Sequence, residues 1–449
     1  MSKNKNISRR RFLKGVTGAV IGTVSLPYII PASALGGNGS FAPSERIVMG
    51  CIGLGGNGTW DLKEFLGKSG VQIVAVCDVN TKARNSARDI VNEKYGNKDC
   101  ATYGDFRELI ARKDIDAVMN STPDHWHSII AITAIRAGKD IHSQKPLAHT
   151  IAEGRAICDA VKRYGAVFQT GSQQRSDREF RRACELVRNG RIGKVQTVRV
   201  GLLYGGSDVY SSPMPKPVPE GLDWDMWLGP SPAAPYTTDR LREWRWVSDY
   251  SSGQITDWAG HNCDIAQWGM GTEHTSPVEI EGSGVFPADG GLYDTAYSYR
   301  FECKYAEGFT MIVEDSEKHP KSKNGITFSI GWRPGLGVLF EGNEGWVHVD
   351  RGGMNVYPES LADTEIRPSE IHLYKSDDHK QNFLDCIRTR SQTIAPPEIS
   401  HRSIMIGYLG AMAIKLGRKL RWDPVKEEFI NDSEANRLLS QPMRSPWHL

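Results

Sequence analysis

A glycine-rich turn at residues 53–58, Gly-Leu-Gly-Gly-Asn-Gly, constrains the fold of this chain more than any other feature. The apolar run before it (47–54) predicts a buried strand, and the pattern after it (60–67) predicts a helix. Glycine at Gly53, Gly55 and Gly58 allows a tight turn, a close approach of the backbone to a ligand, and close packing of the helix on the strand. A strand, such a turn and a helix in this order predict a βαβ unit, and therefore an α/β fold.

The alternation of strands and helices continues to about residue 168. Further strands are predicted at 71–77, 117–120 and 140–143, and helices at 81–94, 106–111, 127–137 and 151–164. This order predicts a Rossmann domain over residues 46–168, in which a doubly wound parallel sheet is covered by helices.

The pattern changes after residue 168. Apolar residues then alternate with polar ones in short runs, which predict strands at 195–203, 278–285, 296–302, 310–314, 327–330 and 337–340. Loops rich in Pro, Gly and Trp join them, and a last helix is predicted at 402–418. We therefore predict a second, α+β domain over residues 169–449 with a mostly antiparallel sheet, which serves substrate binding and oligomerisation.

The glycine turn and the end of the second strand together predict a dinucleotide site. A helix that begins at the turn presents free N–H groups to phosphates. The second strand ends at Asp78, 20 residues after Gly58. A carboxylate there accepts hydrogen bonds from ribose hydroxyls and repels a 2′-phosphate, so we expect NAD rather than NADP. The alternative for Asp78 is a turn residue at the end of a strand.

Composition excludes several classes of protein. The 55 Lys and Arg residues nearly balance 53 Asp and Glu residues, which argues against a nucleic-acid partner. The 449 residues suit two domains, and no stretch after the N-terminal segment approaches the ~20 apolar residues of a membrane span. The eight Cys residues stand at no motif spacing, so we predict neither a metal site nor a particular disulfide.

The first 34 residues have the features of an export signal. Ser8-Arg9-Arg10-Arg11-Phe12-Leu13-Lys14 is a twin-arginine motif, followed by a mildly apolar stretch and by Ala32-Ser33-Ala34. We predict a signal peptide over 1–34, a flexible arm over 35–45, and a periplasmic or otherwise exported protein. The twin-arginine export machinery is then a partner, and the mature protein has no membrane segment.

Two further motifs give the chain a family resemblance. Thr122-Pro123-Asp124-x-x-His127 follows a predicted strand, where loops line the ligand crevice of such sheets, and Lys145-Pro146 follows the next strand. With the glycine turn and Asp78, they resemble the Gfo/Idh/MocA family of oxidoreductases. The resemblance implies that Pro123 and His127 lie at the cofactor and that Lys145 contacts both the nicotinamide ribose and the substrate. The family has Glu before this Lys, and Gln144 stands in its place.

The resemblance extends to a later segment that contains Asp257 and His261. Their spacing of four places them on one helical face, and a His with a carboxylate neighbour suits proton abstraction from an alcohol. The alternatives are an ordinary amphipathic helix and a metal site formed with Asp264. At the start of the second domain, the family implies substrate contacts for Gln169, Gln173 and Arg175. Tyr204 and the segment Glu243-Trp244-Arg245-Trp246 could add an aromatic surface for a sugar.

The resemblance implies an NAD(P)-dependent oxidoreductase that acts on a carbohydrate or polyol, as a homo-oligomer. An exported enzyme meets no free NAD pool, so the cofactor is expected to stay tightly bound. The alternative is an NAD-dependent glycosidase that oxidises a ring hydroxyl, eliminates the glycosidic oxygen, adds water and reduces the ketone again. In the family resemblance, the best-known NAD-dependent N-acetylgalactosaminidases have a different sequence in place of Lys-Pro, so Lys145-Pro146 favours the oxidoreductase. The catalytic set Lys145, Asp257 and His261 argues against a non-enzymatic sugar sensor.

Overall fold

The computed structural model describes residues 42, 45–205, 211, 213–328 and 334–449. The predicted signal peptide, the predicted arm apart from residues 42 and 45, and the end of the strand predicted at 327–330 lie outside these residues. Residues 47–449 form one compact unit. Within the described residues no helix combines the length and apolar character needed to cross a bilayer.

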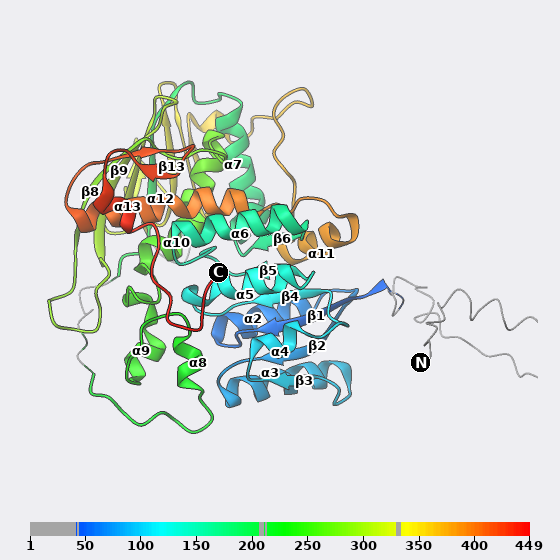
Figure 1. Cartoon of the computed structure of the whole chain (residues 1–449). Helices are drawn as coiled ribbons and strands as arrows, with labels where there is room; N and C mark the ends of the chain where they lie inside the picture. The colour runs from blue at the N-terminus through cyan, green and yellow to red at the C-terminus, as the bar shows by residue number, and fades with distance from the viewer. Residues whose placement is uncertain (1–41, 43–44, 206–210, 212, 329–333) are drawn as a thin grey trace, which may run out of the picture. The chain divides into compact units, whose positions relative to one another are not determined.

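The N-terminal part is built on a six-stranded sheet in which every neighbouring pair is parallel (Figure 1). Its order is β3-β2-β1-β4-β5-β6. The strands before β4 are added on one side of β1 and the later strands on the other side, so the order of the strands reverses between β1 and β4. The strands are β1 (Ile47–Ile52), β2 (Val71–Cys77), β3 (Ala101–Tyr103), β4 (Ala117–Asn120), β5 (Asp140–Ser143) and β6 (Phe168–Thr170). The predicted Rossmann fold is confirmed. Ligands of such sheets bind at the carboxyl ends of the strands, beside this reversal point.

Five helices connect these strands: α2 (Gly56–Leu66), α3 (Thr81–Tyr95), α4 (Phe106–Ile110), α5 (Asp124–Arg136) and α6 (Ile151–Tyr164). Local signals define their ends. The side chain of Asn80 accepts hydrogen bonds from backbone N–H groups at the start of α3, and Thr150 does the same for α6. Helices α2 and α5 begin earlier than predicted, because the glycine turn and the residue after Pro123 already form their first turns.

The C-terminal part contains a nine-stranded sheet of order β15-β14-β13-β7-β10-β9-β8-β16-β17. Its strands are β7 (Val195–Leu202), β8 (Glu279–Val285), β9 (Ser298–Lys304), β10 (Thr310–Asp315), β13 (Gly337–Gly342), β14 (Trp346–Asp350), β15 (Gly353–Tyr357), β16 (Leu420–Asp423) and β17 (Glu428–Phe429). The pair β7–β10 is parallel and the other pairs are antiparallel, which confirms the predicted sheet. Thr327, the first residue of the strand predicted at 327–330, is instead the last residue of β12 (Ile326–Thr327). Strand β12 pairs with β11 (Ser322–Lys323) in a hairpin separate from the nine-stranded sheet.

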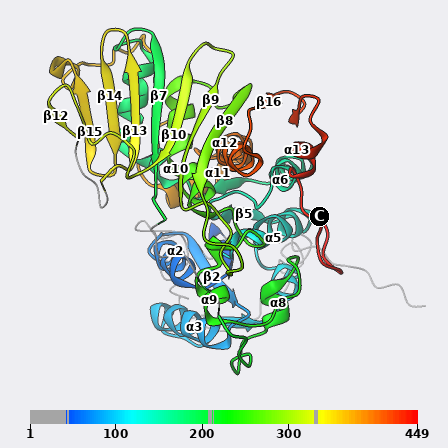
Figure 2. The ribbon, with the colours of Figure 1, turned by 90° about the vertical axis from the view of Figure 1, so that its left-hand side faces the viewer.

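Three helices cover one face of this sheet: α7 (Arg178–Arg188), α10 (Gly253–Met270) and α12 (Pro397–Leu416). Figure 2 shows α10 and α12 between the two sheets. Nearly all side chains of α10 are buried, so it is a core helix rather than an amphipathic surface helix. The helix predicted at 402–418 is α12, which starts five residues earlier, at Pro397.

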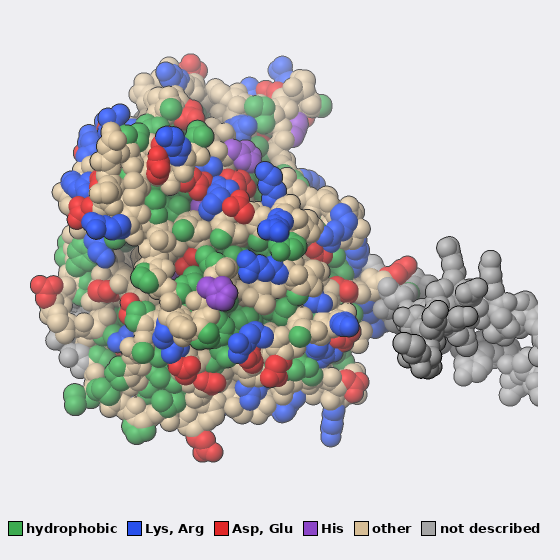
Figure 3. All heavy atoms as spheres, in the orientation of Figure 1, with side chains coloured by type: hydrophobic (Ala, Val, Ile, Leu, Met, Phe, Trp, Pro, Cys, Tyr) green, Lys and Arg blue, Asp and Glu red, His purple; other side chains and the backbone are tan. Residues whose placement is uncertain are grey.

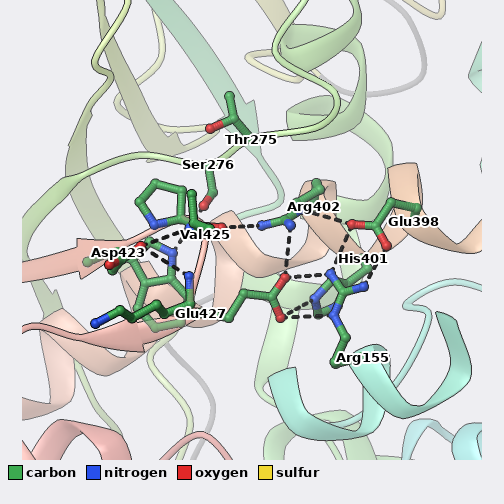
Figure 4. Close-up of polar contacts among 12 residues, drawn as sticks. Arg155, Thr275, Ser276, Glu398, His401, Arg402, Asp423, Val425 and Glu427 are labelled. Atoms are coloured by element: carbon green, nitrogen blue, oxygen red, sulfur yellow. Dashed lines mark hydrogen bonds and ion pairs between the residues drawn. The ribbon is translucent and has the colours of Figure 1, made fainter. Parts of the chain in front are cut away.

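A cluster of charged side chains joins the two parts away from the crevice (Figure 4). Glu427, in the turn between β16 and β17, accepts hydrogen bonds from Arg155 of α6 and His401 of α12 and forms an ion pair with Arg402 of α12. Arg155 also donates to Glu398 of α12 at 2.6 and 2.9 Å. One arginine of the Rossmann domain therefore holds two carboxylates of the second part.

Charges of both signs are mixed on the molecular surface. Figure 3 shows Lys and Arg side chains interspersed with Asp and Glu over the face in view, without a continuous basic field. This arrangement agrees with the near balance of 55 basic and 53 acidic residues.

Candidate active site

The three glycines of the turn at residues 53–58 have different surroundings. Gly53 has a φ of 80°, and a Cβ there would lie 2.6 Å from backbone atoms of Ser121 and Thr122. A Cβ on Gly58 would lie 1.8 Å from the carbonyl oxygen of Gly53. A Cβ on Gly55 would meet no protein atom within 4 Å. Gly53 and Gly58 are thus required by packing, whereas Gly55 leaves room beside the start of α2, as close approach of a pyrophosphate requires.

The glycine turn lines a cavity of about 500 Å³, which we call the turn cavity. Asp78 lines it too, at the end of β2. The Asp78 carboxylate accepts hydrogen bonds from the backbone N–H of Leu54 at 2.6 Å and of Asn80 at 2.8 Å. Burial raises the pKa of Asp78, and these two N–H donors oppose that rise. Asp78 therefore ties the turn to the strand and also faces the space for a ligand.

The structure separates the roles of Pro123 and His127. Pro123 lines the turn cavity, whereas His127 is buried behind it. The ring nitrogens of His127 lie 2.6 Å from the Pro146 carbonyl oxygen and 2.8 Å from that of Thr122. His127 thus braces the two loops that carry Pro123 and Lys145, and we assign it this supporting position rather than a direct contact with the cofactor.

A segment of the second part covers the turn cavity. This segment, residues 221–245, is called the cover below, and it includes α8 (Trp224–Leu228) and α9 (Thr238–Arg242). Its side chains in the cavity wall are Leu222, Met226, Trp227, Leu241, Trp244 and Arg245. Backbone hydrogen bonds fix this cover to the segment that follows Asp78, from Thr81 N–H to Gly221 O at 2.8 Å and from Asp223 N–H to Val79 O at 3.0 Å. The sequence indicated only an aromatic surface around residues 243–246, not a cover.

The C-terminal tail fastens the cover from outside. Arg444 donates to the carbonyl oxygens of Gly229 and Asp225, each at 2.9 Å. Trp447 packs edge-on against Trp126, whose indole N–H bonds to the Trp227 carbonyl oxygen at 3.0 Å. The tail thus contacts both the cover and α5.

A second cavity, of about 690 Å³, adjoins the first, and we call it the α10 cavity. The two cavities share Asn57, Gln144, Lys145 and Arg245 in their walls. The α10 cavity is also lined by Trp60, Gln173, Gln174, Asp177, Phe180, Leu203, Gln254, Asp257, Trp258, His261 and Arg351. Lys145 therefore lies at the junction of a glycine-lined space and a polar, aromatic space.

Lys145, Asp257 and Arg245 form a buried charge cluster at this junction. The Asp257 Oδ1 lies 2.7 Å from Lys145 Nζ and 2.9 Å from Arg245 Nε. Arg245 and Lys145 hold the pKa of Asp257 below its usual value despite burial. Burial lowers the pKa of Lys145, and the charge of Asp257 opposes this. Asp257 is thus an ionised acceptor for two cations.

His261 lies one helical turn after Asp257 and lines the α10 cavity. Its Nδ1 is buried without a hydrogen-bond partner. Burial, followed by the charges of Lys145 and Arg351, lowers the pKa of His261 well below its ordinary value, so the ring is neutral at pH 7. The expected contact between the Asp257 carboxylate and His261 is replaced by the ion pairs of Asp257 with Lys145 and Arg245.

The structure accounts for Gln144 at the position where the family has Glu. Gln144 Nε2 donates to Asp61 Oδ2 at 2.7 Å, and its Oε1 accepts from Lys145 N–H at 3.2 Å. Asp61, on α2, is fully buried and ion-paired with Lys380 of α11 (His379–Thr389). A carboxylate from α2 therefore lies behind Gln144, and a glutamate at position 144 would place a second buried negative charge beside Asp61.

The structure separates the three predicted substrate residues. Gln169 is buried away from the cavity wall, and its Nε2 donates to Asn382 Oδ1 at 3.0 Å. Gln173 lines the α10 cavity. Arg175 is buried away from the cavity wall, in ion pairs with Asp264 at 2.6 Å and Glu273 at 2.8 Å. We therefore assign Arg175 a structural role, because both carboxylates hold it inside the second part. Asp264 is occupied by this pair, and no group of metal-ligating side chains occurs among the described residues.

The comparisons with known proteins agree with this arrangement. Residues 47–172 match the NAD-binding Rossmann fold of an oxidoreductase family, and residues 192–331 and 340–449 match the C-terminal alpha/beta domain of that family. The chain belongs to the Gfo/Idh/MocA family of oxidoreductases.

Two solved structures share the fold over most of this chain. Myo-inositol 2-dehydrogenase from Lactobacillus plantarum is 18% identical, with a TM-score of 0.58, over 84% of this chain and 99% of that one. The aldose-aldose oxidoreductase from Caulobacter crescentus is 19% identical, also with a TM-score of 0.58, over the same shares. Among curated relatives, the alpha-N-acetylgalactosaminidase of Shewanella oneidensis is 31% identical over 204 residues, which are 42% of this chain. That match spans 44% of the relative's length.

Proposed function

We propose that this Gfo/Idh/MocA oxidoreductase acts on a hydroxyl group of a carbohydrate or polyol. The observation that carries the proposal is the position of Lys145, which lines both cavities and is ion-paired with Asp257. A dinucleotide in the turn cavity would supply the hydride acceptor beside the α10 cavity. The residues that would hold it are Gly53, Gly55, Gly58, Asp78, Pro123 and Lys145.

His261 is the proton acceptor in this proposal. It is neutral at pH 7, and since its Nδ1 is buried, Nε2 is the ring nitrogen that can reach a hydroxyl in the α10 cavity. The charge of Asp257 stabilises the imidazolium that forms. Lys145 Nζ donates a hydrogen bond to the oxygen that loses its proton and so stabilises the negative charge developing there.

The cofactor of this proposal is NAD, held through many turnovers. The Asp78 carboxylate in the turn cavity favours a ribose with free hydroxyls over a 2′-phosphate. The cover, formed by residues 221–245, and the C-terminal tail that fastens it support slow release of the nucleotide. Retention suits an exported homo-oligomer that leaves through the twin-arginine machinery, which the motif at residues 8–14 supports.

A redox-cycling glycosidase is the second candidate. The 31% identity with an alpha-N-acetylgalactosaminidase over 204 residues favours it. The Lys145-Pro146 sequence favours net oxidation instead. Both candidates need the same proton acceptor and the same cofactor position, so product analysis rather than geometry separates them.

The deciding experiment uses the purified mature protein. Acid releases any bound nucleotide for identification, and the intact protein is then incubated with free sugars, polyols and aryl glycosides. Reduction of bound NAD by free sugars supports the oxidoreductase, and aglycone release without net NADH supports the glycosidase. Protein that carries no nucleotide and binds neither added NAD nor added NADP contradicts both. Protein stripped of nucleotide and offered both cofactors tests the preference for NAD.

A further inference from the structure

Arg351 is a cation of the α10 cavity that the chemistry above does not use. It lies in the turn between β14 and β15, far along the chain from the other charged groups of the site. Its guanidinium lies 5.0 Å from the centre of the Trp258 ring, which follows Asp257 on α10. Its charge is near enough to lower the pKa of His261. Arg351 therefore lies in the wall of the α10 cavity beside Trp258, with part of its side chain exposed to solvent.

The other charges of this wall are already engaged. Lys145 and Arg245 share the Asp257 carboxylate. Asp177 accepts from the first N–H groups of α7 at 2.8 and 3.3 Å. In the described part of the chain Arg351 forms no ion pair. A guanidinium that is fixed on an indole face and has no carboxylate partner is suited to bind an anionic group of a ligand.

A second feature of the same wall is an unpaired acceptor. Gln174 is buried, and its Nε2 donates to Asn262 Oδ1 at 3.1 Å, while the Asn262 amide nitrogen donates to Gly201 O at 2.7 Å. These bonds fix both amide orientations. The Gln174 Oε1 is left buried without a partner, and Gln174 lines the cavity. A buried acceptor of this kind calls for a donor from the ligand, such as a hydroxyl.

We propose that the substrate of the α10 cavity is a sugar acid, whose carboxylate binds Arg351 and whose hydroxyls reach Gln174 and His261. The inference rests on the proposed function and specifies its substrate class. One unpaired guanidinium matches one negative charge, and a planar carboxylate can take two parallel N–H bonds from it. A phosphate, with close to two charges, would lack a second free cation in this wall.

The test compares matched ligand pairs on the nucleotide-loaded protein. Glucuronate, galacturonate and gluconate are titrated beside glucose, galactose and sorbitol, and glucose 6-phosphate is added as the other anion. Binding is followed by tryptophan fluorescence and by calorimetry, and reduction of bound NAD is recorded in the same samples. The variants are Arg351→Met, Arg351→Lys and, as a control, Arg421→Met, since Arg421 is an exposed arginine of β16.

At least one acid is expected to bind ten times more tightly than its neutral partner. Arg351→Met removes that difference and raises KM for the acid with little change in kcat, Arg351→Lys restores part of it, and Arg421→Met leaves it unchanged. Equal binding of acids and neutral sugars, equal weakening of both by Arg351→Met, or preference for the sugar phosphate overturns the inference. If neutral sugars reduce the nucleotide as well as acids do, the inference fails and the proposed function stands. If acids bind through Arg351 without reducing the nucleotide, the proposed function fails instead.

Discussion

The Lys145 ammonium and the Asp257 carboxylate lie 2.7 Å apart at the junction of the turn cavity and the α10 cavity, although 112 residues separate them in the chain. Lys145 follows β5 of the parallel sheet, and Asp257 lies on the core helix α10. Because Asp257 also binds Arg245, it balances two cations that burial would otherwise penalise. The charge state of the site is therefore set by contacts between the two parts of the molecule.

Substitution of Lys145 or His261 by Ala should stop turnover and leave the nucleotide in place. The two side chains act on the substrate oxygen and its proton, and loss of such groups costs about 10²–10⁴ in rate. Bound nucleotide per protein and kcat are measured together. His274→Ala, at an exposed histidine just after α10, is the control. Variants that lose folding together with activity would assign both residues a structural role.

A pair of glycine substitutions separates ligand space from packing. Gly55→Ala should fold normally, because its Cβ meets no protein atom within 4 Å, but should bind NAD at least tenfold more weakly. Gly58→Ala should fail to fold well, since its Cβ would lie 1.8 Å from a backbone oxygen. Thermal unfolding and nucleotide content report the two effects separately. Full nucleotide retention in a stable Gly55→Ala variant would argue that phosphates do not lie at this turn.

The fold followed from the sequence because apolar periodicity is local. The strands predicted at 71–77, 117–120 and 140–143 match β2, β4 and β5. The short strands β3 and β17 were missed, and so were β14 and β15, which have five residues each. The spacing of four residues placed Asp257 and His261 on one helical face, but the proximity of Lys145 to them came from a family resemblance. No sequence pattern relates Asp61 to Lys380, 319 residues away, or brings Arg351 to Trp258. Such pairs arise only when helices and sheets pack, so neither Arg351 nor the carboxylate behind Gln144 could be predicted.

Loosening the C-terminal tail should speed release of the nucleotide. Arg444 and Trp447 hold the cover and α5 from outside without lining the cavity. A variant with Arg444→Ala and Trp447→Ala should lose bound NAD faster than wild type by tenfold or more, with little change in the chemistry of the site. Dilution into an NAD-scavenging solution measures the rate. Arg437→Ala, at an exposed residue of α13 (Ser433–Arg437), is the control. An unchanged rate in the double variant would show that the tail does not limit release.

Removal of the Glu427 charge should destabilise the protein in a pH-dependent way. Hydrogen bonding from His401 and Arg155 lowers the pKa of Glu427 from 4.5 to about 2, against the effect of burial. Since the folded-state pKa is depressed, the stabilisation is fully present above pH 4.5 and is lost as the pH falls towards 2. Burial also lowers the pKa of His401, which acts in the same direction below its ordinary value of 6.5. Glu427→Gln should therefore lower the free energy of unfolding by about 1.5–3 kcal/mol at pH 7, the range for hydrogen bonds to a charged group, and by progressively less below pH 4.5.

Denaturant unfolding at several pH values tests this prediction, with Glu307→Gln, at an exposed glutamate, as the control. A deficit that stays constant from pH 7 to pH 3 would mean that packing, not the charge of Glu427, joins α6 to α12 and the β16–β17 turn.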